Sequence, residues 1–570
     1  MILIYKQLFR QIIKDRLFLS LLLLLITLTS LSFFFVIFSI DGNMEMLRTF
    51  DTLTSNQVLY QNALHSNTVL AYTFWLSLIG LCVFVFIMFY YRFFRENKKQ
   101  IGCIKALGFQ NRTLQFFFGA FTGILSVFGA IIGLVGGYFL SDILIHANSQ
   151  TYQMTGLTKG IRGFHFIIGT GVSTLIFCIT AILCYGFVRN KETSFLLAGS
   201  RIPNHFSVTL KIADCMSKLA PTRQRLSFRI ALRKPLSILL LFVAVMSFQV
   251  CFILGQSLHI SSGKIFRMQT SGHNYEYDTH FLEYQTAPIS DDAMVYLDHT
   301  AVFIINHNTL ERTITGLYET NGLYALRNKD NELLTTPNVG AVYINPEFLE
   351  VYGVQVGDSL TAEIAGESYS FTVKEIAVNA KSNHIYMNGA QLAEILDIPS
   401  GAYNGILSAT IFEGDIVTNK AQCIAELNRN FVSNKTSAII NQVTGVLVGA
   451  ILIFLALYIT FQDNTHDILI LNLIGYRIKA IRKLLINVYL PVLWSAFALT
   501  LVPSIMVARA IQKSLSISTN DYMPFGVNLL VIVIAFVLIT MIYWSIQVAF
   551  SFKTKRVIAR EKIMDSIYAE

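Results

Sequence analysis

Long apolar runs separated by polar stretches are the dominant pattern along the chain. Eight of these runs contain no Asp, Glu, Lys or Arg, and each is long enough to cross a hydrocarbon core of about 30 Å as a helix. The runs are Leu17–Ile40, Val69–Tyr91, Leu114–Leu140, Phe164–Val188, Leu236–Leu258, Ala438–Phe461, Leu484–Ala508 and Val527–Phe550. The first run is longer than the apolar core of a signal peptide, so we expect it to remain as a span. The pattern predicts an α-helical polytopic membrane protein with eight transmembrane helices.

Composition and charge support this class and give the spans a direction. Hydrophobic residues make up 54% of the 570 residues and charged residues 14%, against about 25% in soluble proteins, which excludes a soluble enzyme. With the N-terminus placed inside, 29 of the 44 Lys and Arg residues fall in inner segments. Because cationic residues accumulate on the cytoplasmic side, we expect both termini in the cytoplasm. The basic inner segments suit membrane lipid headgroups, and we expect no nucleic-acid partner.

Two sequence matches indicate an internal duplication. The motif at Phe9, Arg10, Lys14 and Leu17 recurs at an offset of 219 as Phe228, Arg229, Arg233 and Leu236. The motif at Glu96, Asn97, Ile101, Gly108, Phe109 and Arg112 recurs at an offset of 367 as Asp463, Asn464, Ile468, Gly475, Tyr476 and Lys479. The extra sequence in the second copy agrees with its much longer first outside loop. We therefore predict two pseudo-symmetric four-helix halves and one inserted outer domain.

The outer domain, residues 258–436, is predicted to be α+β. Leu360–Ile364 and Tyr369–Val373 alternate apolar and polar residues around a turn at 365–367, and 346–352 and 389–396 are typical of short helices. The domain holds 21 acidic and 10 basic residues, a charge that suits either a cationic peptide ligand or simple solubility.

The predicted order is an amphipathic helix (1–16), the first half (17–190) with a turn at 92–112, a basic linker and second amphipathic helix (191–235), the fifth span (236–257), the outer domain (258–436), spans six to eight (437–550) with a turn at 462–483, and a tail (551–570).

The two inner turns are the candidate functional elements. Ile101, Ile104 and Leu107 are spaced to share one helical face, as are Ile468, Leu471 and Ile474. Gly108 and Gly475 are predicted to end these helices in a left-handed conformation. Two interpretations remain open: the turns contact a partner ATPase, or they are amphipathic helices lying on headgroups.

Glycines recur at four-residue spacing in the third span, which permits close approach of neighbouring helices. They are Gly119, Gly123, Gly129, Gly133 and Gly137. Static packing and a sliding interface between the halves are both compatible with this spacing. In the fifth span, Gln249 and Gln256 are predicted to form interhelical hydrogen bonds.

Motifs for chemistry are missing. The chain has no Gly-x-x-x-x-Gly-Lys-Ser/Thr loop for phosphate, so we expect it to be a non-catalytic subunit. The spans lack ionisable residues except His165 at an edge, which disfavours an ion-driven transporter. The outer histidines lack zinc-protease spacing and are expected to be exposed or structural. We expect no catalytic residue, cofactor or metal in this chain, and the sequence leaves the substrate site unknown.

The segment Glu96–Phe109, with Ile101-Gly102 and Lys105-Ala106-Leu107-Gly108, resembles the FtsX/MacB-type permease signature. The copy at Asp463–Tyr476 keeps the acid, Ile468 and Gly475-Tyr476. Val351–Leu360 is similar to the Gly-Val-x-Val-Gly-Asp strand of that family's outer domain.

The resemblance implies a permease subunit of a MacB-like (type VII) ABC transporter in a bacterial cell membrane. Two copies of a separate ATPase would use ATP and Mg²⁺, coupled through Glu96, Ile101, Lys105, Leu107, Gly108, Asp463, Ile468, Leu471, Gly475 and Tyr476. The implied substrate is hydrophobic or amphipathic, such as an antimicrobial peptide or a lipoprotein. The alternative is mechanotransmission to a cell-wall hydrolase or a sensor kinase.

Overall fold

The computed structural model describes residues 8–13, 15–51, 54–197, 235–287, 292–305, 308–319, 321–477, 480, 489–519 and 522–568. The chain divides into two compact units. The helical unit comprises residues 1–254, 440–508 and 528–570, and the β-rich unit comprises residues 255–439 and 509–527. The second copy of the first repeat motif, at 228–233, lies outside the described residues.

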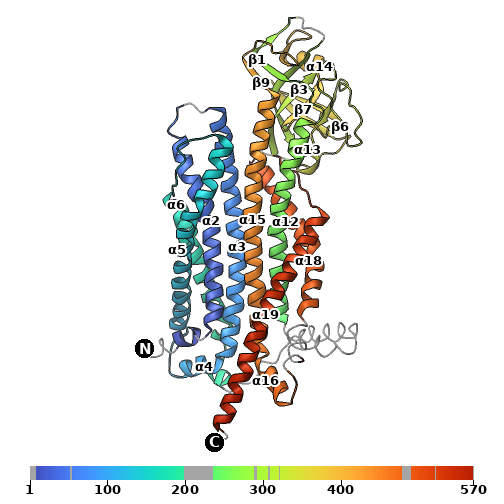
Figure 1. The fold of residues 1–570 in the computed structure, drawn as a ribbon. Helices are drawn as coiled ribbons and strands as arrows, with labels where there is room; N and C mark the ends of the chain where they lie inside the picture. The colour runs from blue at the N-terminus through green and yellow to red at the C-terminus, as the bar shows by residue number, and fades with distance from the viewer. Residues whose placement is uncertain are drawn as a thin grey trace. The chain divides into compact units, whose positions relative to one another are not determined.

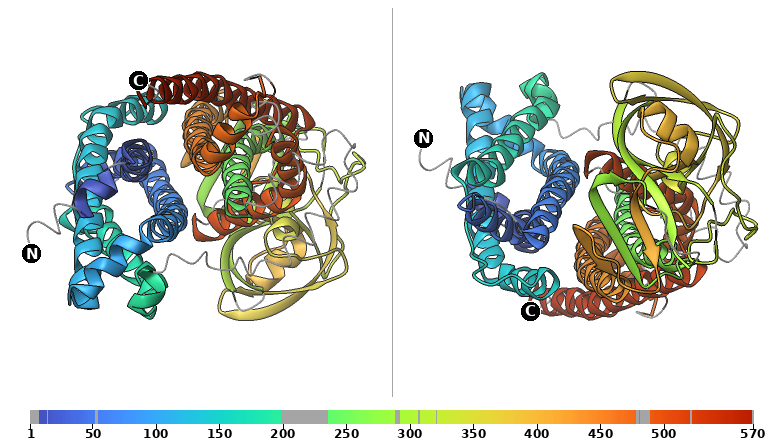
Figure 2. Two further views of the ribbon diagram at one scale, coloured as in Figure 1. Left: turned by 90° about the horizontal axis from the view of Figure 1, so that it is seen from below. Right: turned by 90° about the horizontal axis from the view of Figure 1, so that it is seen from above.

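Long helices that lie nearly parallel build the helical unit (Figure 1). The helices of the first half are α2 (Arg16–Leu47), α3 (Ser55–Glu96), α4 (Lys98–Ala106), α5 (Asn111–Tyr152), α6 (Gly163–Phe166), the π-helix η1 (Ile167–Val172), α7 (Ser173–Cys184), α8 (Gly186–Arg189) and α9 (Thr193–Leu197). Those of the second half are α12 (Pro235–Thr270), α15 (Lys420–Asp463), α16 (Thr465–Leu473), α18 (Tyr489–Thr519) and α19 (Leu529–Tyr568). Viewed along their axes, α2, α3, α5 and α7 form one group (Figure 2).

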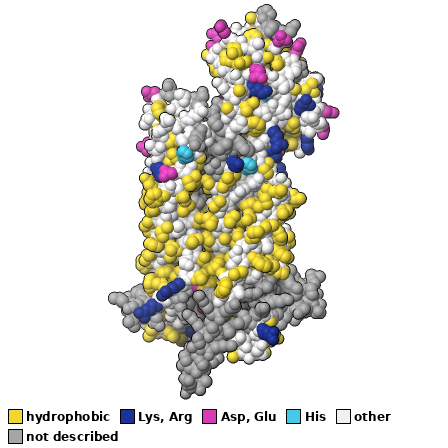
Figure 3. Space-filling model, in the orientation of Figure 1, with side chains coloured by type: hydrophobic (Ala, Val, Ile, Leu, Met, Phe, Trp, Pro, Cys, Tyr) yellow, Lys and Arg dark blue, Asp and Glu magenta, His cyan; other side chains and the backbone are white. Residues whose placement is uncertain are grey.

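The predicted eight spans are confirmed. Eight described helices are long and apolar enough to cross a membrane. Hydrophobic side chains also cover the middle of the helical unit on the face shown in Figure 3, as a lipid-facing surface requires. The helices continue beyond the apolar runs, because polar residues at the ends can extend a helix into the headgroup region without a hydrogen-bonding cost.

Helix α2 illustrates this extension, since it runs past Ile40 and carries a buried carboxylate. Asp41 is 1% exposed, and both of its oxygens lie 2.8 Å from Nδ1 of His165. The backbone N–H of Arg162 also donates to Asp41 (2.8 Å). The N–H of Thr158 donates to the Asn43 side chain (2.9 Å). These polar side chains therefore replace water as partners for the chain segment that leads into the fourth span.

The glycines of α5 face two helices of the same half. A Cβ at Gly133 would lie 2.6 Å from Cβ of Ser30 and 2.7 Å from the carbonyl oxygen of Thr27, both on α2. Gly129 and Gly137 also approach α2, whereas Gly119 and Gly123 approach α7. The structure thus places these glycines in packing contacts inside the first half, and not in an interface between the halves.

The prediction of interhelical hydrogen bonds in the fifth span is confirmed for Gln249. Its Nε2 donates to the carbonyl oxygen of Phe497 (2.9 Å), and its Oε1 accepts from the hydroxyls of Thr500 (2.8 Å) and Ser504 (2.9 Å). All of this buried amide's contacts are on α18, so it fixes the register of α12 against α18.

The β-rich unit is built on one nine-stranded sheet in the order β3-β7-β4-β6-β5-β2-β8-β1-β9. The strands are β1 (Tyr277–Gln285), β2 (Met294–Ile305), β3 (Asn308–Leu317), β4 (Ala341–Ile344), β5 (Ser359–Ile364), β6 (Glu367–Ile376), β7 (His384–Asn388), β8 (Tyr403–Ser408) and β9 (Ile416–Asn419). Because β3 also pairs with β2, the six strands from β3 to β2 close into a ring. Strands β8, β1 and β9 extend from it.

Long strand β2 makes this closure possible. Its residues 294–296 pair with β8 and residues 302–304 pair with β5, while 296–305 pair with β3 on the other side. Alternating side chains such as Leu297, Phe303 and Ile305 are buried and contribute to a core shared with α13 (Pro346–Glu350) and α14 (Gly389–Ile395).

The predicted hairpin and short helices of this unit agree with the structure, but the first and last residues of the unit differ from those predicted. The predicted hairpin is formed by β5 and β6, with Ala365 and Gly366 at positive φ in the turn. The two predicted short helices are α13 and α14. However, α12 continues to Thr270 and α15 already begins at Lys420, so helix occupies both ends of the segment assigned to the outer domain. Residues 509–527, assigned to the second membrane half, belong to the β-rich unit.

The close approach at Gly133 gives a stability prediction. We expect Gly133→Ala to lower the free energy of unfolding by about 2 kcal/mol, because the methyl group would meet the α2 backbone. Gly80→Ala is the matched control: no atom lies within 4 Å of its added Cβ, and we expect a change below about 1 kcal/mol. Thermal unfolding in detergent measures both, and equal midpoints would contradict the packing role.

Candidate functional site

The first inner turn consists of helix α4 and the residues around it. Ile101 and Ile104 are 1% and 9% exposed, whereas Leu107 follows the last helical residue and is 69% exposed. The prediction of one apolar face is therefore wrong for Leu107, because the helix ends before its side chain can turn inward. Glu96 forms an ion pair with Nε of Arg92 (2.7 Å).

Lys105 attaches α4 to the end of the fourth span. Its Nζ donates to the carbonyl oxygens of Val188 (3.2 Å), Arg189 (3.0 Å) and Lys191 (3.2 Å). The first two carbonyls belong to the end of α8, where a helix has no backbone donors of its own and carries a partial negative charge, and the third lies two residues beyond it. Burial lowers the pKa of Lys105. The lysine therefore positions the turn against the end of the fourth span.

Gly102 explains the tight contact between α4 and α9. A Cβ at this position would lie 2.9 Å from Cβ of Leu196 and 3.3 Å from its carbonyl carbon. The Ile-Gly pair of the motif is thus a buried Ile101 followed by a residue without a side chain, which lets α9 pack directly on α4.

Both turns end in the same hydrogen-bonded cap. Gly108 and Gly475 have φ of 86° and 95°, the left-handed conformation that was predicted. The N–H of Gly108 donates to the carbonyl of Lys105 (3.0 Å), and that of Phe109 donates to Ile104 (3.4 Å).

In the second turn, Gly475 donates to Asn472 (3.0 Å) and Tyr476 donates to Leu471 (3.0 Å). These are the two bonds of a Schellman motif, which reverses the chain sharply after each helix.

The second turn exposes more large apolar residues than the first turn does. In α16, Ile468 is fully buried and Leu471 is half-buried, whereas Leu473, Ile474 and Tyr476 are 72%, 68% and 46% exposed. Ile474 thus departs from the predicted apolar face as Leu107 does. Asp463 is the last residue of α15, and its side chain lies outside the described residues. Where the first copy has Lys105, the second has Asn472.

A polar junction links the two turn-bearing helices, α3 and α15. Nη2 of Arg92 donates to Oε1 of Gln462, and Tyr458 donates to Asp15 (2.6 Å). Arg92 is 6% exposed, so its guanidinium lies between packed helices. Sequence reasoning missed this junction. The available signal was a lone arginine within the aromatic run Tyr90–Phe94.

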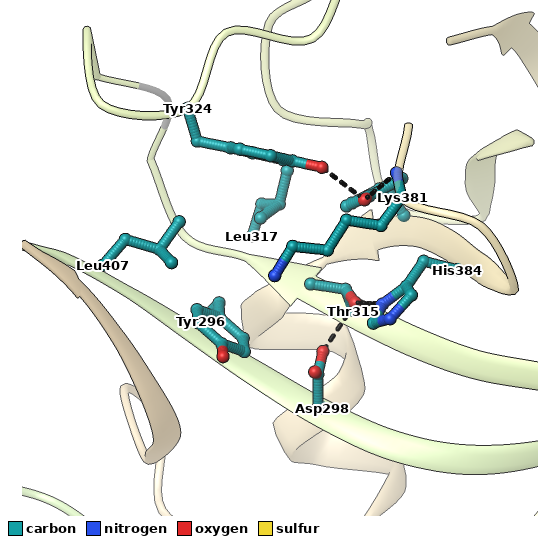
Figure 4. Close-up of a pocket in the computed structure, with 9 residues that line it drawn as sticks. Tyr296, Asp298, Thr315, Leu317, Tyr324, Lys381, His384 and Leu407 are labelled. Atoms are coloured by element: carbon teal, nitrogen blue, oxygen red, sulfur yellow. Dashed lines mark hydrogen bonds between the residues drawn. The ribbon is translucent and has the colours of Figure 1, made fainter. Parts of the chain in front are cut away.

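The β-rich unit holds a second cluster of polar residues, which line a small cavity with room for about one water molecule (Figure 4). Nζ of Lys381 donates to Asp278 (2.8 Å), and the hydroxyl of Tyr296 donates to the other oxygen of the same carboxylate (2.6 Å). The hydroxyl of Thr315 donates to Asp298 (2.5 Å) and so accepts from Nδ1 of His384 (2.9 Å).

Burial sets the protonation of this cluster. It lowers the pKa of His384 to about 3 and raises that of Asp298 to about 6. Burial also lowers the pKa of His273 to about 4; the His273 ring packs against Tyr324, a cavity-lining residue, with 4.7 Å between ring centroids. Burial acts to lower the pKa of Lys381, but the Asp278 carboxylate together with Tyr275, Tyr296 and Tyr324 outweighs it, and the pKa lies above the usual value.

This cluster joins the closed ring, through β2, β3 and β7, to the extension at β1. With its groups hydrogen-bonded and its cavity this small, we assign it a structural role. Across the described ranges, no three His, Cys, Asp or Glu side chains are grouped as metal ligands.

The fold and the turns thus define a multi-pass membrane protein made of two related four-helix halves. Residues 72–193 and 443–556 each match the family described as FtsX-like permease C-terminal. Each match begins in the second span of a half and includes one capped turn. The two matches show that an FtsX-like permease domain is present twice, once in each half of the chain.

Similarity to individual proteins is more limited. Over 81 residues the chain is 33% identical to an uncharacterized ABC transporter permease of Methanocaldococcus jannaschii, a match that covers 13% of this chain and 20% of that protein. The chain therefore matches about a fifth of that relative. The periplasmic region of MacB from Actinobacillus actinomycetemcomitans aligns with 28% of this chain and 95% of its own, at 9% identity and a TM-score of 0.20. At that score the likeness supports no conclusion.

The Lys105 contacts give a second prediction. We expect Lys105→Met to speed amide exchange in residues 186–197, because three carbonyls lose a charged donor worth about 2 kcal/mol. Lys99→Met, an exposed lysine on the same helix, is the control. Hydrogen-exchange mass spectrometry compares the variants, and unchanged exchange in Lys105→Met would show that the contacts do not hold the turn.

The polar cluster gives a pH prediction. Between pH 7 and 5 the unfolded chain binds protons at His273 and His384 that the folded unit excludes, so stability falls as pH falls. Asp298 acts in the opposite sense, because its folded pKa is raised, and offsets part of the loss. At about 1.4 kcal/mol per proton and pH unit, we expect the free energy of unfolding to fall by roughly 2–3 kcal/mol between pH 7 and pH 5.

Amide exchange in β3 and β7, corrected for intrinsic rates, measures this loss. The control is His384→Asn, which keeps a donor for Thr315 but does not titrate, and we expect it to flatten the pH dependence. The same slope in both proteins would contradict the assignment to His384.

Proposed function

We propose that this chain is the permease subunit of an ABC transporter and works with a separate ATPase that binds ATP and Mg²⁺. The observation that carries the proposal is the pair of matching turns. Each lies in a matched FtsX-like domain, ends in a left-handed glycine cap and exposes large apolar residues at its tip: Leu107 in one, Leu473, Ile474 and Tyr476 in the other. Two such surfaces suit two ATPase subunits.

Within each turn, buried and exposed residues have different roles in this proposal. Ile101, Lys105 and Ile468 hold the turns on the helices above them, and the exposed tips contact the ATPase. Glu96 restrains Arg92, whose guanidinium connects to Gln462 at the end of α15. Motion of either turn would thereby reach both halves through packed, hydrogen-bonded helix ends, as rigid-body helix shifts require.

The proposed output is movement of the β-rich unit. The chain passes between the two units inside α12, α15 and α18, each of which is a continuous helix across that point, and a fourth time between residues 527 and 528, before α19. A helix transmits displacement better than a flexible loop does. We propose that the movement extracts or exports a hydrophobic or amphipathic substrate, such as a peptide or a lipoprotein. The excess of basic residues in the inner segments supports cytoplasmic termini and an extracytoplasmic β-rich unit.

A non-transport role is the alternative: the same movement would activate a cell-wall hydrolase or a sensor kinase. The acidic character of residues 258–436 does not distinguish the two roles, because it suits peptide capture and protein docking equally. Substrate-stimulated ATP hydrolysis by the purified complex supports transport. Dependence of every phenotype on a wall enzyme or kinase supports regulation.

The caps allow a sharp test of coupling. We expect Gly108→Val to reduce permease-stimulated ATP hydrolysis at least about tenfold, because a β-branched residue disfavours a φ of 86° and redirects the tip. Gly108→Asn is the matched control, since asparagine adopts this conformation more readily and no atom lies within 4 Å of the added Cβ. The assay uses the complex in nanodiscs.

Both variants should insert in the membrane at wild-type levels. Equal stimulation by Gly108→Val, Gly108→Asn and the wild type would count against a coupling role for the first turn.

A further inference from the structure

The β-rich sheet leaves an open edge at β9. Closure of the six-stranded ring pairs both sides of its strands, and β8 and β1 each have two neighbours, so among the described strands β9 ends the sheet. Open edges carry backbone groups ready to pair with another strand, and proteins usually guard them with lysine, proline or a bulge. Strand β9, with the sequence Ile-Val-Thr-Asn, contains neither lysine nor proline.

The register shows which backbone groups face outward. Lys420 N–H donates to the carbonyl of Glu276 (2.9 Å), in line with the pairing of β9 with β1. Because hydrogen-bonded pairs alternate in an antiparallel ladder, residues 416 and 418 also bond to β1. The N–H and C=O groups of Val417 and Asn419 then point to the open side.

Side chains beside this edge are apolar and exposed. Ile416 and Val417 are 55% and 40% exposed, and nearby Ile411 and Leu282 are 66% and 80% exposed. The N–H of Leu282 already has a partner, because Asp415 accepts from it (2.8 Å) where β9 has not yet begun. An apolar patch therefore flanks the open backbone of β9.

Acidic side chains predominate around the edge, where the nearest cations are Lys420, directly after β9, and Lys381, which is paired with Asp278. Residues 276–285 and 409–419 contain no Lys or Arg, and Glu276, Glu283, Glu413 and Asp415 are exposed there. Two copies of this edge would bring like charges together, which disfavours pairing between copies of the chain. A positively charged strand would instead be attracted.

We propose that the open side of β9 is a docking surface for an extended, basic segment of a partner protein, which adds to the sheet as a further strand. Backbone hydrogen bonds at Val417 and Asn419 would supply the pairing, the apolar patch would receive alternate side chains, and the acidic surround would select a cationic segment. This surface is independent of the ATPase turns, so the proposal goes beyond the proposed function and does not rest on it.

The test uses the full chain in zwitterionic nanodiscs and a fluorescent peptide with blocked ends that alternates lysine with valine. We expect saturable binding in the micromolar range. Methylation of alternate backbone nitrogens of the same peptide removes strand donors but keeps its charge, and we expect binding to weaken at least about tenfold.

Val417→Pro is the matching change in the protein. It removes an outward N–H, keeps the ladder to β1, and should weaken binding by a similar factor, whereas Val417→Thr keeps the N–H and should change binding less than about threefold. Amide exchange in β1 and β8 verifies that each variant is folded.

Three results would overturn the proposal. Absence of saturable binding shows that the edge takes no such strand. Equal binding of the methylated peptide, or equal binding to Val417→Pro, shows adherence by charge alone. A dimer of the wild-type chain that Val417→Pro abolishes shows that the edge pairs two copies instead.

Discussion

Hydrocarbon offers no hydrogen-bond partner, and this constraint governs how polar groups are placed in the helical unit. Gln249, buried in a span, has both ends of its amide bonded to α18. Asp41, at the end of another span, is bonded to His165 and to a backbone N–H. Arg92 is buried at a helix end with acceptors from Glu96 and Gln462. Each of these hydrogen-bonded polar groups therefore also holds its helix in place against a neighbouring segment.

Polar contacts at the helix ends and close packing along the helix length have different consequences. The α5 glycines bring backbones within van der Waals contact over several turns, so the first half behaves as a packed block. The junction of Arg92, Gln462 and Asp15 joins the halves through a few polar contacts near the turns. Polar contacts at helix ends can exchange partners while the apolar core that includes residues of both halves stays packed, which suits an element that receives an external force.

The sequence predicts local features well because neighbouring residues determine them. Apolar run length gives the spans, alternation gives the β5–β6 hairpin, and glycine after a helix gives the caps at Gly108 and Gly475. The roles of Asp41 and Lys105 were not predictable in this way. The partner of Asp41 is 124 residues away, and those of Lys105 are over 80 residues away. Ring closure likewise depends on the pairing of β2 with three strands, which no local pattern encodes. The exposure of Leu107 was missed for a simpler reason: periodicity does not show where a helix stops.

The difference between Lys105 and Asn472 follows from what comes after the last span of each half. The fourth span ends in α8 and is followed by the short helix α9, and Lys105 and Gly102 match that arrangement. After the eighth, α19 continues as one helix to Tyr568, and the second turn has neither residue. A permease assembled from two identical chains must use one sequence on both sides of its axis. Fusion removes that obligation, so the two sides of this molecule have been free to diverge in how firmly each turn is held.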